Sequence, residues 1–299
     1  MAGHFLDEAA YDTLLVPADG DVLVLKPDGT PLLCVCRQVL KGAAYRAAYM
    51  AIRPLALQAP QDNRGVAAGL LKDRERVADL PSVARSRAVG KRSAVRYSSL
   101  KRDGTVSTTS RGRVTPSFVA GYSDRSPRFP YCRQTAYTAR YPERLQALVP
   151  CLRVISQLLQ THVPARYVAQ AAVVARTVPE FIITGTVFTT LTVNRNWQTA
   201  VHRDVGDLKT GFGAMACFRA GDYAGGYYVM PQFRVAVDLY AGDVVLSDVH
   251  EWHGNTPLHG NPKAYERITM VCYYRERMVD CLPFAEELER VRRTRGAIQ

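Results

Sequence analysis

After residue 180 the chain consists almost entirely of short apolar runs separated by turns, and this pattern constrains the fold more than any other feature. Turn signals such as Ala220-Gly221-Asp222 and Ala241-Gly242-Asp243 divide the runs. Many short strands at this spacing are typical of a β-sandwich or a double-sheet jelly roll. The runs expected to form strands are 181–193, 198–204, 213–219, 226–230, 235–239, 243–249 and 267–275.

Helical patterns flank this strand-rich region. Apolar residues recur at helical spacing in residues 142–176, where Pro150 predicts a kink or two shorter helices and Pro164 can open the next helix. Residues 283–295 predict a C-terminal helix, and Asp28-Gly29 between two apolar runs predicts a β-hairpin. We therefore expect an α+β fold. Its expected parts are a small β-rich N-terminal element (1–60), a basic and partly loop-like extension (61–141), and helices with the strand-rich core (142–299).

Composition limits the class of protein. The 299 residues are 47% hydrophobic, which is enough to bury a full core. The chain has no apolar run of about 18 residues, so we expect no transmembrane helix and no membrane partner. The N-terminal segment MAGHFLDEAAYDTLL lacks a basic region followed by an apolar stretch, which is the pattern of a signal peptide. We therefore expect an intracellular protein.

The positive charge is concentrated in one quarter of the chain. Residues Lys72–Arg144 hold 17 Lys and Arg against 6 Asp and Glu, a local net charge of +11 in a chain of net charge +12. Such a concentration is expected of a polyanion-binding surface, although a solvated face gives the same count. Within it, the polar segment Lys101–Arg113 predicts a loop that a partner would order.

The seven cysteines are an odd number and include no CxxC pair. Cys34 and Cys36 lie two apart, on one face of an expected strand, but two ligands do not make a zinc site. We therefore expect the cysteines to be reduced and partly buried thiols.

The chemistry is carried by His202-Arg203-Asp204. Residues two apart on a strand point to the same face, so this histidine and this aspartate can bind one metal together. His253 or His250, in DVHEWHGN, can supply a third ligand, and His253 is favoured because it begins the next expected strand. Two histidines and one carboxylate are diagnostic of non-haem Fe(II) oxygenases. The HxD motif by itself is weak, because His202 alone could be a hydrogen-bonded core histidine.

An arginine follows the distal histidine at a spacing that suits a cosubstrate-binding residue. Arg267 lies fourteen residues after His253 and could bind the far carboxylate of a 2-oxoglutarate cosubstrate through its planar fork. Thr269, on the same strand face, could add a hydroxyl donor. Arg275, at the strand end, is the second candidate, and a surface salt bridge is the alternative role for Arg267.

With these residues in place, the sequence resembles the TET/JBP family of Fe(II)/2-oxoglutarate-dependent nucleic-acid oxygenases. The resemblance is carried by VNRNWQTAVHRDVGD (193–207), FRAGDYAGGYYVMPQFRVAVDLYAGDVVLSDVHEWHGNTPL (218–258) and ERITMVCYYR (266–275). Residues 121–138 are similar more loosely, and residues 1–60 show no match. The compact length, without the zinc-binding Cys-rich region of animal TET enzymes, is closer to protist, algal and viral members.

The resemblance implies a double-stranded β-helix core and a role for each motif residue. His202, Asp204 and His253 match the iron ligands, and Arg267 matches the residue that binds the 2-oxoglutarate carboxylate. Asp207 matches a position that contacts the flipped base in relatives. Fe(II) and 2-oxoglutarate are the implied cofactors, and one algal relative uses ascorbate in place of 2-oxoglutarate.

We therefore expect a monomeric dioxygenase that oxidises the methyl group of 5-methylcytosine in DNA, with the target base flipped out of the duplex. It would act where the DNA is, in the nucleus if the protein is eukaryotic and in the cytoplasm if it is bacterial or viral. The alternatives are a thymine hydroxylase, an oxygenase acting on RNA, a protein hydroxylase, and a nucleic-acid-binding protein with a vestigial iron site. The expected phosphate contacts are Arg92, Arg96, Lys101, Arg111 and Arg113.

Overall fold

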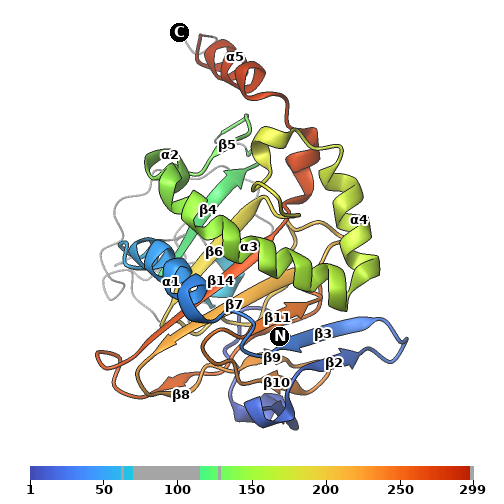
Figure 1. Cartoon of the computed structure of the whole chain (residues 1–299), viewed down its shortest axis with the longest axis vertical. Coiled ribbons are helices and arrows are strands. Elements are labelled where there is room, and N and C mark those ends of the chain that lie inside the picture. The colour runs from blue at the N-terminus through green and yellow to red at the C-terminus, as the bar shows by residue number, and fades with distance from the viewer. Residues whose placement is uncertain (62–63, 70–114, 127–128, 297–299) are drawn as a thin grey trace, which may run out of the picture.

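Two facing β-sheets form the centre of the computed structural model, which describes residues 1–61, 64–69, 115–126 and 129–296 (Figure 1). The larger sheet is antiparallel and has eight strands. In spatial order these are β2 (Val22–Leu25), β3 (Pro31–Cys36), β11 (Val244–Ser247), β7 (Gly213–Ala220), β14 (Glu266–Tyr273), β6 (Thr190–Arg195), β4 (Ser117–Ser123) and β5 (Arg133–Gln134).

The smaller sheet has four strands, in the order β1 (Thr13–Leu15), β10 (Val235–Val237), β9 (Tyr228–Met230) and β12 (Gly254–Asn255). A separate two-stranded ribbon joins β8 (Ala224–Gly225) to β13 (Leu258–His259). This arrangement confirms the predicted α+β fold with a double-stranded β-helix core.

Side chains of the central strands alternate between two cores. On β7, Met215 and Cys217 pack against the smaller sheet, whereas Ala216 and Phe218 pack against the helices. A strand that is buried on both faces reads as a continuous apolar run rather than an alternating one, because each face has its own covering layer. The interior between the two sheets is the space that the HxD motif faces.

Helices cover the outer face of the larger sheet (Figure 1). They are α1 (Gly42–Ala56), α2 (Ala136–Arg140), α3 (Pro142–His162) and α4 (Pro164–Val174), with α5 (Phe284–Gly296) at the C-terminal end. Leu152, Ile155 and Leu159 of α3 are fully buried against the sheet, and burying a side chain of this kind stabilises the fold by about 1.5–3 kcal/mol. The helix continues through Pro150, which lies on its exposed side, and α4 begins at Pro164 as predicted.

The structure changes several local predictions. Only the end of the predicted strand 181–193 is extended, because residues 179–181 form a 3-10 turn before β6 begins at Thr190. Residues 198–204 form no strand, and His202 makes only an isolated bridge to His253. The helix α1 was not predicted.

The N-terminal residues belong to both sheets. The hairpin β2–β3, with Gly29 at φ 82° in its turn, adds two strands to the edge of the larger sheet. β1 extends the smaller sheet by pairing in parallel with β10. The first 36 residues therefore complete the core rather than preceding it.

The prediction of seven reduced, partly buried thiols was wrong for two cysteines. Cys132 and Cys281, 149 residues apart in sequence, form a disulfide with a Cα–Cα distance of 5.8 Å. The other five are free, as predicted, and all are buried. The disulfide could not be predicted from spacing, because only the folded chain brings the segment before β5 next to the segment after β14.

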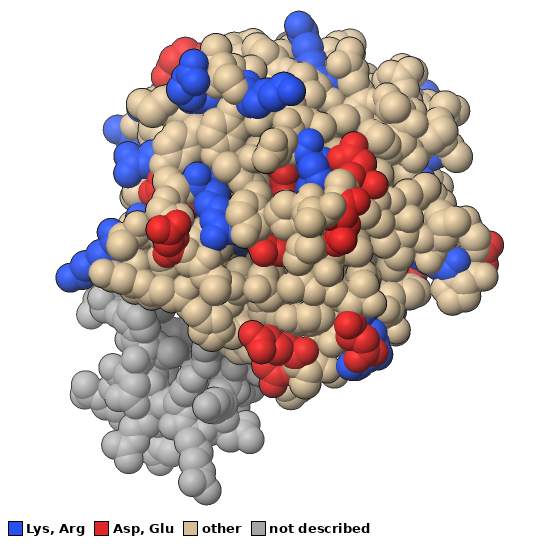
Figure 2. All heavy atoms as spheres, turned by 60° about the horizontal axis from the view of Figure 1, so that its bottom comes forward, with Lys and Arg blue, Asp and Glu red and all other residues tan. Residues whose placement is uncertain are grey.

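Most of the excess positive charge lies outside the described residues. Residues 62–63, 70–114, 127–128 and 297–299 hold 13 of the Lys and Arg and 5 of the Asp and Glu, or eight of the twelve net positive charges. On the face shown in Figure 2, the described Lys and Arg are dispersed among Asp and Glu. The five predicted phosphate contacts, Arg92, Arg96, Lys101, Arg111 and Arg113, all lie outside the described residues. None of the described helices is long and apolar enough to cross a membrane.

Candidate functional site

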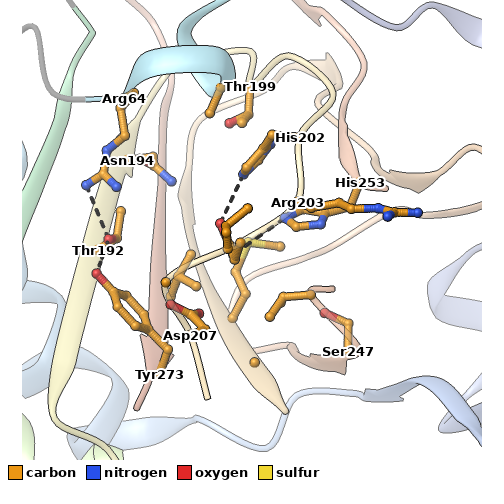
Figure 3. Close-up of a pocket in the computed structure, with 18 of the residues that line it drawn as sticks. Arg64, Thr192, Asn194, Thr199, His202, Arg203, Asp207, Ser247, His253 and Tyr273 are labelled. Carbon is orange, nitrogen blue, oxygen red and sulfur yellow. Dashed lines mark hydrogen bonds and ion pairs between the residues drawn. The ribbon is translucent and has the colours of Figure 1, made fainter. Parts of the chain in front are cut away.

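A cavity of about 320 Å³ lies between the two sheets, and its wall contains His202, Asp204 and His253. Figure 3 labels the two histidines. Ser247, Val271 and Tyr273 contribute from the larger sheet and Tyr228 and Asn255 from the smaller one. The HxD segment closes one side. The site is thus built from segments more than fifty residues apart, which the two sheets bring together.

The two histidines lie directly opposite each other. The backbone N–H of His202 donates to the carbonyl of His253 at 2.9 Å, and that of His253 donates to the carbonyl of His202 at 3.0 Å. Such a pair places both side chains on one face, and the ring centroids are 4.3 Å apart. Asp204 points between them, with its Oδ1 3.5 Å from Nε2 of His202 and its Oδ2 3.7 Å from Nε2 of His253.

Backbone carbonyls orient both rings. Nδ1 of His202 lies 2.8 Å from the carbonyl of Ala200, and Nδ1 of His253 lies 2.9 Å from the carbonyl of Glu251. A carbonyl only accepts, so each Nδ1 carries the proton and each Nε2 presents its lone pair toward Asp204. Carbonyl oxygens that fix the tautomer in this way are the usual partners of metal-binding histidines.

The charges at the site suit a cation. Burial, followed by the neighbouring His202, lowers the pKa of His253 to about 4, so this ring is neutral at pH 7. Burial acts to raise the pKa of Asp204, but His202, His253 and the Arg64 guanidinium together hold it well below the usual range of an aspartate. Two imidazoles and one carboxylate, with ligand atoms within 4.8 Å of one another, therefore converge on one point.

His250 is turned away from this point. Its Nε2 lies 3.0 Å from the carbonyl of Leu208, and it does not belong to the cluster formed by His202, Asp204 and His253. Of the two candidates for the third ligand, the structure therefore brings His253 to the HxD motif.

The predicted cosubstrate residues lie next to the cavity but not in its wall. Arg267 is 3% exposed, and its Nη2 donates to the carbonyl of Gly226 at 2.8 Å. The side-chain amide of Asn255, which does line the cavity, donates to the same carbonyl at 3.4 Å, so Arg267 lies directly behind Asn255. Thr269 is buried two residues further along β14, in register with Asn194, which also lines the cavity.

Three other arginines, Arg64, Arg203 and Arg275, line the cavity, and the sequence analysis missed Arg64. Arg64 precedes the 3-10 turn Gly65–Ala68, and its Nη2 donates to the hydroxyl of Thr192 at 3.2 Å (Figure 3). Its Nε is buried and has no hydrogen-bond partner among the described residues. Arg275, the second candidate of the sequence analysis, is held by Asp124, whose Oδ1 accepts from its Nε at 2.7 Å. No sequence motif marks Arg64, because only tertiary contacts place it.

Asp207 also lies in the cavity wall (Figure 3). An isolated bridge to Arg275 fixes its backbone beside the end of β14, and its side chain makes no hydrogen bond to another described residue. Burial, followed by the negative charge of Asp204, raises the pKa of Asp207 well above that of a free aspartate, while Arg275 and Arg64 act in the opposite direction.

Comparison with known families decides what kind of protein this is. Residues 119–276, more than half of the chain, match the model of the Tet/JBP family, described as the oxygenase domain of the 2OGFeDO superfamily. This chain belongs to the Tet/JBP oxygenase family. The match begins within β4 and ends just after β14, so it includes the whole HxD…H segment, but it excludes the N-terminal hairpin and Arg64.

The relatives of this Tet/JBP chain include proteins named as thymine dioxygenases. It is 37% identical over 162 residues to the bifunctional helicase and thymine dioxygenase JBP2 of Trypanosoma brucei brucei, which covers 52% of this chain and 14% of the relative. It is 30% identical over 240 residues to the thymine dioxygenase JBP1 of Leishmania braziliensis, which covers 79% of this chain and 28% of the relative. The chain therefore spans less than a third of either relative.

A solved structure supports the fold. The structure described as NgTET1 in complex with 5mC DNA matches this chain with a TM-score of 0.54 at 13% identity and covers 88% of this chain and 82% of that one. At this identity the likeness concerns the arrangement of sheets and helices.

The cavity suits the cofactors of the superfamily, Fe(II) and 2-oxoglutarate. The donor set of two imidazoles and one carboxylate is the facial triad of non-haem Fe(II) oxygenases, and the tautomers described above leave Nε2 of both rings available. The arginines in the wall, together with the buried Arg267 behind it, suit a dicarboxylate cosubstrate.

Proposed function

We propose that this protein oxidises the methyl group of 5-methylcytosine in DNA, with Fe(II) and 2-oxoglutarate as cofactors. The observation that carries the proposal is that the His202–Asp204–His253 cluster and Asp207 line the same cavity. The cluster would hold iron, which supplies the oxidising power when 2-oxoglutarate and oxygen are also bound. A base that reaches this cavity has to leave the duplex.

The remaining roles follow from position and charge. Arg267, buried in the interior between the sheets, is our proposed partner for the far carboxylate of the cosubstrate, with Thr269 beside it. The cavity cations Arg64 and Arg275 keep the wall positive around the two carboxylates. The basic segment that includes Lys101 and Arg113 would bind the phosphates.

Asp207 is the proposed base-reading residue. A cytosine presents its exocyclic N4 amine, a donor, where a thymine presents the acceptor O4. The Asp207 carboxyl can accept from N4 in either protonation state, but it can donate to O4 only when protonated. Cytosine is therefore favoured while the carboxyl is ionised, and leaving the wrong base unpaired costs on the order of 1–3 kcal/mol.

Thymine is the second candidate, and a specific observation favours it. The curated relatives that share 30–37% identity with this chain are named as thymine dioxygenases. Burial raises the pKa of Asp207 and so favours the protonated form that could donate to O4. The two candidates make opposite predictions for the same pair of substrates.

The test is product formation on matched duplexes that carry either 5-methylcytosine or only thymine, with the nucleosides identified by mass. We expect oxidation of 5-methylcytosine to exceed that of thymine about fivefold or more, as a difference of 1 kcal/mol requires. Asp207→Ala should lose activity on 5-methylcytosine, and Asp207→Asn, which can donate and accept, should narrow the gap. Faster oxidation of thymine by the unmutated protein would establish the second candidate instead.

Parallel reactions separate the remaining alternatives. Replacing 2-oxoglutarate by ascorbate tests the cosubstrate, and replacing duplex DNA by methylated RNA or by a peptide tests the substrate class. A vestigial iron site predicts no iron-dependent consumption of oxygen under any of these conditions.

A further inference from the structure

Two cysteines outside the cavity converge on one point. Cys34 and Cys36 lie on β3 and belong to the core beneath the helices, whereas Val35 between them packs toward the smaller sheet. Their Sγ atoms are 4.0 Å apart. Both side chains are almost completely buried, at 2% and 0% exposure. The active-site cavity does not include either residue.

The fold brings a third metal-binding side chain next to the two cysteines, and no sequence motif indicates it. His162 is the last residue of α3, and the helix layer brings it over β3. One ring nitrogen of His162 and the two Sγ atoms all lie within 4.8 Å of one another. The imidazole is half-buried, so it connects the buried thiols to the solvent.

This donor set has the chemistry and the dimensions of a soft-metal site. Zinc binds thiolates at about 2.3 Å with tetrahedral angles, which places two coordinated sulfurs roughly 3.8 Å apart. The observed separation of 4.0 Å is close to this value. A disulfide is the poorer alternative, because residues two apart on a strand carry parallel side chains on Cα atoms roughly 6.6 Å apart, near the upper limit for a bridge.

We propose that Cys34, Cys36 and His162 bind a thiophilic divalent cation of the zinc type, with water in the fourth position. The cation would join the end of α3 to β3. β3 pairs with β11, and the chain that follows β11 carries His253, so the site would stabilise the strand that leads to the active site.

Cobalt provides a spectroscopic test on the full chain. The protein is stripped with a chelator, and Co²⁺ is added while the near-ultraviolet absorption is recorded. Charge transfer from sulfur to cobalt appears only where a thiolate binds the ion. The His202–Asp204–His253 cluster contains no sulfur, so cobalt bound there does not contribute to the charge-transfer band.

We expect the wild-type protein to show the charge-transfer band and Cys34→Ser, Cys36→Ser and the double variant to lose it. Cys151→Ser, which removes a buried free thiol from α3, is the matched control and should keep it.

Zinc stoichiometry provides a second measurement that does not depend on replacing core residues. His162→Gln removes the half-buried ligand, and its folding is checked by circular dichroism. We expect it to bind one zinc ion fewer per chain, whereas His202→Ala should lose the other, cavity-bound ion and keep the thiolate band. Absence of the band from the wild-type protein, or equal zinc binding by wild type and His162→Gln, would show that the three residues are only packed together.

Discussion

At the residue scale, the assignment of the metal ligands depends on two reciprocal backbone hydrogen bonds between His202 and His253. We predict that His202→Ala, Asp204→Ala and His253→Ala each abolish turnover and weaken iron binding, because each removes one of three donors. His250→Ala should keep most of the activity, because the His250 ring bonds to the carbonyl of Leu208. Activity and iron affinity are measured together, with circular dichroism as the control for folding. An active His253→Ala protein beside an inactive His250→Ala protein would reverse the ligand assignment.

The cosubstrate arginine is a second question at this scale, because Arg267 lies behind the cavity wall and Arg64 lies in it. We predict that Arg267→Ala raises the KM for 2-oxoglutarate about 30-fold or more, as expected when a buried charge-assisted pair worth roughly 2–5 kcal/mol is lost. Arg219→Gln is the matched control, because Arg219 is paired opposite Arg267 on β7. If Arg64→Gln raises the KM and Arg267→Ala does not, the cavity cation binds the carboxylate.

At the scale of elements, the N-terminal hairpin holds the segment that carries His253. Nζ of Lys26, from the β2–β3 turn, lies 2.9 Å from Asp248 and 2.7 Å from Glu251, and Arg166 of α4 lies 3.1 Å from the same Asp248. The carbonyl of Glu251 in turn orients the ring of His253. The hairpin lies outside the residues that match the family model, yet it contacts the metal-ligand segment directly.

We therefore predict that Lys26→Met lowers the iron affinity about tenfold, the lower end of the effect expected for outer partners of metal ligands. The dissociation constant for Fe(II) is measured anaerobically, and the activity is measured at saturating iron. Most of the activity should return at saturating iron, because the ligands themselves are intact. Lys263→Met, which changes an exposed lysine in another loop, is the control. Equal iron affinity in both variants would mean that β11 alone positions His253.

At the scale of the whole molecule, the net charge predicts how the protein binds DNA. Each phosphate contact contributes about 0.9 to the slope of log affinity against log salt concentration. Replacing Lys101, Arg111 and Arg113 together by Gln should reduce that slope by about 2 to 3, provided that each contacts a phosphate. The same change at the exposed Lys41, Lys263 and Arg292 is the control and should leave the slope nearly unchanged. An affinity that does not depend on salt would exclude phosphate contacts as the source of binding.

Local patterns in the sequence were sufficient for the strand-rich core, the hairpin at Asp28-Gly29 and the helix that opens at Pro164. These features depend on the spacing of apolar residues along a strand or helix and on the residue types at turns. Both can be read from a few neighbouring residues in the sequence. The order of the HxD motif, the strands, the distal histidine and the arginine indicated a non-haem iron site, because these residue types in this order suit that kind of metal site.

Only the tertiary structure decided which residues surround the site. Arg64 enters the cavity wall 138 residues before His202, Cys132 meets Cys281 across 149 residues, and His162 reaches Cys34 across the layer between helix and sheet. The choice of His253 over His250 also depended on the backbone pairing with His202. Such contacts join segments whose spacing along the chain carries no period and no motif. They arise from the packing of two sheets and a helix layer, so no local pattern in the sequence could have predicted them.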